Sequence, residues 1–157
     1  MKLKLKRPIC FFDLETTGTN ISTDRIVEIA ITKVTPDGKE EVKCRKINPT
    51  IPIPIEASLV HGIYDEDVKD EPTFGQVSKG LFEFMKGCDL GGFNSNKFDV
   101  PLLLEEFHRV GVEFEVANIN LVDVQNIFHQ MEQRTLVAAY KFYCNKDLTD
   151  AHSAEAD

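Results

Sequence analysis

The sequence lacks long apolar runs, clustered cysteines and an excess of positive charge. No stretch approaches about 18 uninterrupted apolar residues, so we expect no membrane span. Four cysteines stand far apart with no Cys-x-x-Cys pair, which disfavours a zinc site or a disulfide framework and favours buried thiols in a reducing cytosol. The basic residues 2–7 are not followed by an apolar segment, so we expect no signal peptide and a cytoplasmic protein.

The charge balance narrows the possible functions without deciding between them. The net charge of −8 disfavours a general nucleic-acid coating protein, because such proteins are usually basic. It does not exclude an enzyme that holds a few nucleotides through bound metal ions, since each divalent cation reverses two charges locally. The 157 residues, 42% hydrophobic and 28% charged, are typical of one soluble domain, which we expect to span residues 1–157.

The hydrophobic pattern predicts three strands, which are followed by alternating helices and strands. The expected strands are 9–15, 25–35, 41–47, 89–93 and 119–122. The expected helices are 56–60, 74–85, 98–110, 124–133 and 135–143, with a last helix from about residue 150. The first half of this order is a hairpin of antiparallel strands, and in the second half strands alternate with helices. This order indicates an α/β fold, with a mixed sheet and helices packed on its faces.

The most informative motif is Asp13-Leu14-Glu15-Thr16-Thr17-Gly18, at the end of the first expected strand. Side chains two residues apart in a strand share a face, so Asp13 and Glu15 project side by side. Two adjacent carboxylates on an apolar strand repel each other unless a cation lies between them. Mg²⁺ and Mn²⁺ are hard divalent cations that prefer such oxygen ligands.

Two further acidic positions are candidates to join this pair. Asp99 follows the fourth expected strand and two glycines, and lies in the first turn of the next helix. It could serve a ligand at the strand ends, or could be a carboxylate that the helix dipole favours.

The other candidate position is at the end of the sequence, where His152 and Asp157 are five residues apart. Such positions differ by about 140° around a helix, so they act together only if His152 lies at or before the first turn. Thr149 or Asp150 could cap a helix there. The alternative for His152 is a surface histidine at a helix start.

These segments together resemble the DEDDh group of 3′–5′ exonucleases, which includes the proofreading subunit of bacterial DNA polymerase III, ribonuclease T and oligoribonuclease. Residues 13–18, 94–99 and 152–157 resemble its three motifs, and residues 55–63 resemble the polymerase-subunit branch. The resemblance implies a ribonuclease H-like, mixed five-stranded sheet with an antiparallel hairpin half, a parallel half and helices on both faces. The family continues the last helix beyond the position of Asp157, so we expect that helix to be truncated here.

The resemblance also implies roles for individual residues. Two Mg²⁺ or Mn²⁺ ions would be held by Asp13, Glu15, Asp99 and Asp157. His152 would be the general base. The substrate would be contacted by Thr16, Thr17, Gly18, Glu56, His61 and Phe98. For three of these residues the sequence leaves an alternative open. Glu56 could be a solvated acid, His61 could be a satisfied histidine, with its ring nitrogens hydrogen-bonded within the protein, and Phe98 could be a core residue.

The function implied is hydrolysis of nucleic-acid 3′ ends, single-stranded or frayed, to nucleoside 5′-monophosphates by two metal ions. The segment at residues 55–63 favours DNA, with a DNA polymerase subunit as a possible partner. One alternative is a catalytically weak or inactive module of the same fold that binds a nucleic-acid end or a protein. The others are an RNA-directed exoribonuclease and, as the weakest, a metal-binding structural domain.

Overall fold

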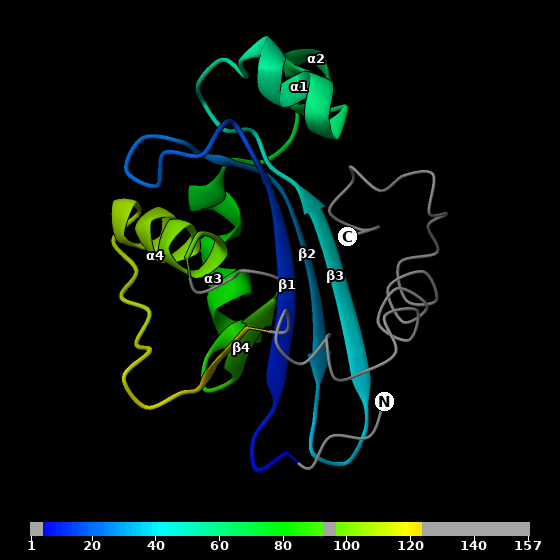
Figure 1. The fold of residues 1–157 in the computed structure, drawn as a ribbon, viewed down its shortest axis with the longest axis vertical. Helices are drawn as coiled ribbons and strands as arrows, with labels where there is room; N and C mark the ends of the chain where they lie inside the picture. Colours follow the sequence, from blue (N-terminus) through cyan, green and yellow to red (C-terminus); the bar gives the residue numbers. More distant parts are fainter. Residues whose placement is uncertain (1–4, 93–96, 124–157) are drawn as a thin grey trace.

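A five-stranded sheet with helices against it forms the body of the computed structural model, which describes residues 5–92 and 97–123 (Figure 1). The strands are β1 (Ile9–Thr16), β2 (Ile26–Val34), β3 (Glu40–Lys46), β4 (Asp89–Gly92) and β5 (Leu121–Asp123). The helices are α1 (Ile55–His61), α2 (Asp65–Val68), α3 (Phe74–Met85) and α4 (Asp99–Arg109). None of these helices is long and apolar enough to cross a membrane.

The sheet is mixed, with the strand order β3-β2-β1-β4-β5. β1 pairs antiparallel with β2, and β2 pairs antiparallel with β3. On its other edge β1 pairs parallel with β4, and β4 pairs parallel with β5. The predicted combination of an antiparallel hairpin half and a parallel half is therefore confirmed.

The elements agree with the sequence pattern to within two residues at nearly every boundary. Gly62 ends α1 with a φ of 75°, a left-handed conformation that favours glycine. The short helix α2 was not predicted, because four residues are too few to show helical periodicity. The helices expected at 124–133, at 135–143 and from residue 150 lie outside the described residues, so helices on the second face of the sheet stay a prediction.

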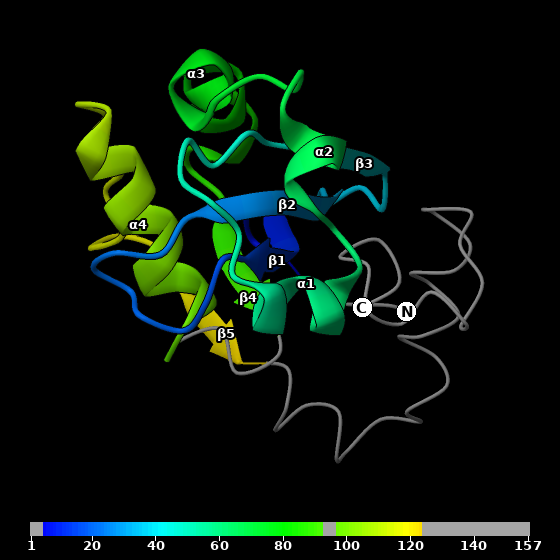
Figure 2. The same cartoon turned by 90° about the horizontal axis from the view of Figure 1, so that it is seen from above.

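The main core lies between the sheet and the helices α3 and α4, which Figure 2 shows on the same side of the sheet. Phe12 of β1 and Leu90 of β4 are fully buried there, and so is Phe107 of α4. The Phe107 ring lies 5.1 Å from that of Phe74 in an edge-to-face arrangement. This packing seats α4, whose first turn carries Asp99, against the sheet.

A buried carboxylate fixes α4 to the start of β2. The backbone N–H of Ile26 donates to Glu106 Oε2 at 3.0 Å, and Arg109 Nη1 lies 2.5 Å from Glu106 Oε1. Burial raises the pKa of the Glu106 carboxyl, although the Ile26 N–H and Arg109 act in the opposite direction. The first N–H of β2 and the last turn of α4 thus share one acceptor.

A buried histidine fixes α1 to the end of β1. Ile63 N–H donates to His61 Nδ1 at 3.1 Å, so Nε2 carries the proton that it donates to the Thr16 carbonyl at 3.0 Å. His61 is only 7% exposed. Both ring nitrogens therefore have partners within the protein, which matches the alternative of a satisfied histidine.

Acidification should weaken this contact. Burial lowers the pKa of His61 below its ordinary 6.5, although the Thr16 carbonyl and Glu28 oppose that shift. Below pH 6.5 the unfolded chain then binds the proton more readily than the folded chain, so the free energy of unfolding falls as the pH drops toward the lower folded-state pKa. Urea unfolding at a series of pH values between 5 and 8 measures this dependence. The free energy of unfolding should change less steeply with pH in His61→Gln than in the wild type.

At pH 8 the His61→Gln variant should lose about 1–3 kcal/mol, because the buried Ile63 N–H loses its acceptor. His108→Gln, which removes an exposed imidazole, is the matched control. An NMR titration that places the pKa of His61 at or above 6.5 would contradict this account.

Candidate active site

Two carboxylates lie on one face of β1, at its C-terminal end. Asp13 is half-buried and Glu15 is only 8% exposed. Phe12 and Leu14 alternate with them and face the core under α3 and α4. The strand thus holds both acids on the face opposite to this core.

Glu28 of β2 lies directly opposite Glu15 in the antiparallel register. It is 2% exposed, and Lys46 Nζ of β3 lies 3.3 Å from its Oε2. Negative charge is therefore concentrated on this face, and Lys46 compensates part of it. Sequence reasoning missed Glu28, although a lone acid inside the apolar run Ile26–Ala30 was the available signal.

The topology brings Asp99 to the same edge of the sheet. β4 runs parallel to β1 in a register that pairs Phe11 with Gly91, so both strands end at one edge. Asp99 is 6% exposed in the first turn of α4, seven residues beyond the end of β4. A carboxylate there also interacts favourably with the helix dipole.

The complete predicted metal-ligand set cannot be assembled from the described residues. Within 5–92 and 97–123, no three His, Cys, Asp or Glu side chains form a group that could hold a metal ion. Asp157, the fourth predicted ligand, and His152, the predicted base, lie outside these residues. The chemistry of the acids that are described does fit Mg²⁺ or Mn²⁺, because buried carboxylates are the oxygen donors that such ions take.

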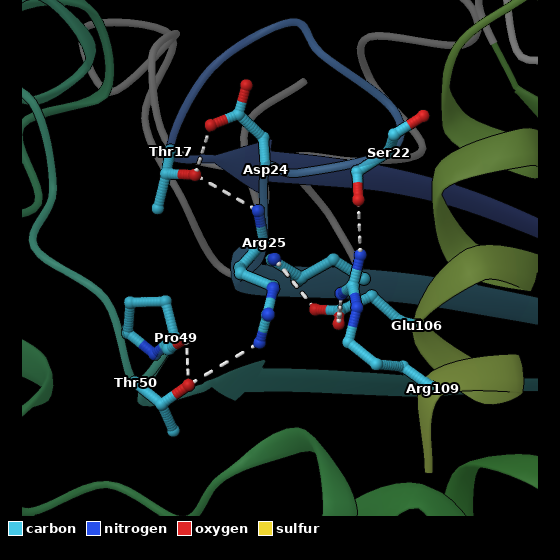
Figure 3. Close-up of polar contacts among 9 residues, drawn as sticks. Thr17, Ser22, Asp24, Arg25, Pro49, Thr50, Glu106 and Arg109 are labelled. Atoms are coloured by element: carbon cyan, nitrogen blue, oxygen red, sulfur yellow. Dashed lines mark hydrogen bonds and ion pairs between the residues drawn. The ribbon is translucent and has the colours of Figure 1, made fainter. Parts of the chain in front are cut away.

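Thr17 and Asp24 fix the loop that follows β1 (Figure 3). Thr17 Oγ1 donates to Asp24 Oδ1 at 2.8 Å and accepts from the Arg25 N–H at 3.0 Å. The other carboxylate oxygen of Asp24 accepts from the Asn20 N–H at 2.8 Å. A Cβ at Gly18 would lie 2.6 Å from that oxygen, so only glycine fits without a shift. The backbone of residues 16–18 is therefore preorganised.

The remaining predicted substrate contacts differ in their surroundings. Glu56 is exposed in the first turn of α1, and Phe98 is half-buried and packs against the main core. α1 also exposes large apolar side chains that sequence reasoning did not assign: Ile55 at 57%, Leu59 at 70% and Val60 at 59%. Because His61 binds the Thr16 carbonyl, this apolar surface borders the end of β1.

Comparison with known proteins identifies the family. The model of the family described as Exonuclease matches residues 10–157. The PolC-type DNA polymerase III of Caldanaerobacter subterraneus is 30% identical over 119 residues, which are 76% of this chain and 8% of that protein. The epsilon subunit of DNA polymerase III of Treponema pallidum is 34% identical over 95 residues, which are 60% of this chain and 44% of that subunit. The 3′-5′ exonuclease DinG of Staphylococcus epidermidis is 23% identical over 92% of this chain and 16% of that protein.

Solved structures show the same fold. Exonuclease I superposes with a TM-score of 0.75 and 16% identity over 97% of this chain and 38% of its own. Escherichia coli exonuclease I in complex with a dT13 oligonucleotide gives a TM-score of 0.74 at 16% identity over 97% of this chain and 39% of its own. The chain thus spans less than half of each relative and structure named here. The predicted resemblance is confirmed: the chain belongs to the Exonuclease family and has its ribonuclease H-like fold.

Proposed function

We propose that the chain, as a single exonuclease domain over residues 1–157, is a metal-dependent 3′–5′ exonuclease. The observation that carries this proposal is the placement of Asp13 and Glu15 on one face of β1, at the sheet edge from which the chain leads to Asp99. A two-metal site for phosphodiester hydrolysis needs such acids, because their carboxylates hold the divalent cations near the attacked phosphate and the attacking water.

Two Mg²⁺ or Mn²⁺ ions are the proposed cofactors, held by Asp13, Glu15, Asp99 and Asp157. When bound, such ions supply a water of lowered pKa and stabilise the attacking and leaving oxygens. His152 is the proposed general base, since an imidazole with a pKa near 6.5 accepts a proton near neutral pH.

The surroundings of β1 would position the 3′ end. The fixed loop offers its backbone at Thr16, Thr17 and Gly18, and its hydrogen bonds hold that backbone in place before substrate arrives. Glu56, His61 and Phe98 are the proposed contacts to the terminal nucleotide. Because both His61 nitrogens already have partners, we assign its contact to the ring surface.

The proposed substrate is DNA with a single-stranded or frayed 3′ end. This preference is supported by the relatives among DNA polymerase III subunits and by exonuclease I, whose structure was determined with a dT13 oligonucleotide. By the same argument a DNA polymerase subunit is the proposed partner. We place the protein in the cytoplasm, in keeping with the buried thiols of Cys10 and Cys88.

Loss of one ligand should abolish hydrolysis while the fold persists. With a 5′-labelled oligodeoxynucleotide and Mg²⁺ or Mn²⁺, Asp13→Asn or Asp99→Asn should lower the shortening rate by more than about a thousandfold, because the charge that holds a metal is lost. Circular dichroism checks the fold, and Asp70→Asn, at an exposed acid, is the matched control.

Chelation by EDTA should stop the reaction in the same assay. Digestion at full rate in EDTA would contradict the metal mechanism, and binding without shortening would identify a binding module instead. A matched oligoribonucleotide that is degraded faster than the DNA would contradict the proposed DNA preference.

The general base is tested separately by His152→Ala. Removal of a positioned base should cut the rate by about 10²–10⁴-fold, and the acidic limb of the pH–rate profile should disappear because that limb reports the titration of the base. His108→Ala is the control for removal of an exposed imidazole. A His152→Ala enzyme with the wild-type rate and pH profile would exclude this role.

A further inference from the structure

Glu15, Glu28 and Lys46 form one row across the first three strands of the sheet, which lie side by side in Figure 1. Glu15 of β1 is the direct partner of Glu28 of β2, and Glu28 is the direct partner of Lys46 of β3. Direct partners in antiparallel strands point to the same face of the sheet. Because Glu15 is a proposed metal ligand, this row joins the proposed metal site to the edge strand β3.

Two buried carboxylates stand next to each other in this row, those of Glu15 and Glu28. The Cβ atoms of direct partners are about 5 Å apart, and like charges at such positions destabilise a sheet. Glu28 also interrupts the buried apolar run at residues 26–31, where a charge is costly to bury. Stability of the sheet alone therefore does not account for an acid at this position.

The ion pair with Lys46 compensates the charge of Glu28 only in part. Lys46 Nζ lies 3.3 Å from Glu28 Oε2, but the Lys46 side chain is 44% exposed. Water screens such a cation, and an ion pair with a buried member adds little stability once its loss of hydration is counted. The fold thus keeps the carboxylate buried beside Glu15 and leaves its cation on the outer side of the row.

Two further observations connect Glu28 with the end of β1. Burial lowers the pKa of His61, and the Thr16 carbonyl and the Glu28 charge oppose this shift, so Glu28 acts on the ring that holds Thr16. The register of β1 with β2 also shifts between Glu15 and Thr16, directly beside the row. Irregularities of this kind bend a strand and are frequent next to active sites. Glu28 is therefore coupled to the same end of the sheet as the proposed ligands.

We propose that Glu28 is a positioning residue of the metal site: its carboxylate, held by Lys46, adds negative charge behind Glu15 and so strengthens the binding of divalent cations at the end of β1. A divalent cation bound by Glu15 attracts both carboxylates, so it offsets the repulsion between them. Glu28 acts through Glu15 and is not itself a proposed ligand. This inference rests on the proposed function, because it requires Glu15 to hold a metal ion.

The affinity for Mn²⁺, measured without substrate, tests the role of Glu28. The electron paramagnetic resonance signal of free Mn²⁺ gives the dissociation constant at pH 8 and low ionic strength, and NMR line broadening at residues 13–16 shows whether the ion binds there. Glu28→Gln should weaken binding by about 10–100-fold, the usual effect of a group behind the ligands. Glu83→Gln, which removes the acid of an exposed ion pair on α3, should bind as the wild type does.

Lys46→Gln should have the opposite effect. Loss of a positive charge beside Glu28 should tighten Mn²⁺ binding a few-fold, and added salt should reduce this gain by screening. The double variant Glu28→Gln, Lys46→Gln should have an affinity between those of the two single variants. A merely structural role of the ion pair predicts weaker binding in all three variants. Lys86→Gln, which removes the cation of the exposed pair on α3, is the matched control.

The outcomes separate this inference from the proposed function. If the wild type binds Mn²⁺ at residues 13–16 and a folded Glu28→Gln binds it equally tightly, the role of Glu28 is overturned and the proposed function stands. Weaker binding in Lys46→Gln than in the wild type would also overturn that role, even if Glu28→Gln failed to fold. A wild type that binds no Mn²⁺ at residues 13–16 would contradict both proposals.

Discussion

The parallel pairing of β1 with β4 is the constraint on which the rest of the structure depends. Parallel strands end at the same edge, and the register of Phe11 with Gly91 fixes which residues emerge together there. Asp13 and Glu15 leave that edge on β1, while β4 leads to α4 and Asp99. A slip of one residue in β1 would turn both acids toward the apolar core. The burial of Phe12 and Leu14 opposes such a slip.

Three buried polar groups then hold the surrounding segments at this end of the sheet. His61 joins α1 to β1, Thr17 with Asp24 closes the loop, and Glu106 joins α4 to β2. In each case a side chain hydrogen-bonds to a group in another segment of the chain. That hydrogen bond holds the segment in place, and no additional strand or helix is needed to do so. Burial makes these contacts sensitive to any change that leaves a donor or acceptor without its partner.

The sequence was most informative where one residue pattern fixes one element. The apolar spacing from Phe74 to Met85 predicted α3 at its observed bounds, and the alternation around Asp13 predicted β1. The convergence of distant acids came from the family resemblance, since no local pattern contains it. Glu28 was missed because its importance depends on partners across the sheet, Glu15 on β1 and Lys46 on β3. α2 was missed because it is a single turn, stabilised by the capping contacts between Tyr64 and Asp67.

The central claim is that acids separated in the sequence share divalent cations at the end of β1. Paramagnetic Mn²⁺, added below one equivalent, broadens NMR signals only close to where it binds. The account predicts that the amide signals of residues 13–16 and 99–101 broaden first, and that Asp99→Asn weakens this effect at both segments together. Broadening that is centred elsewhere in the wild type would contradict the claim. So would broadening at residues 13–16 that is as strong in Asp99→Asn as in the wild type.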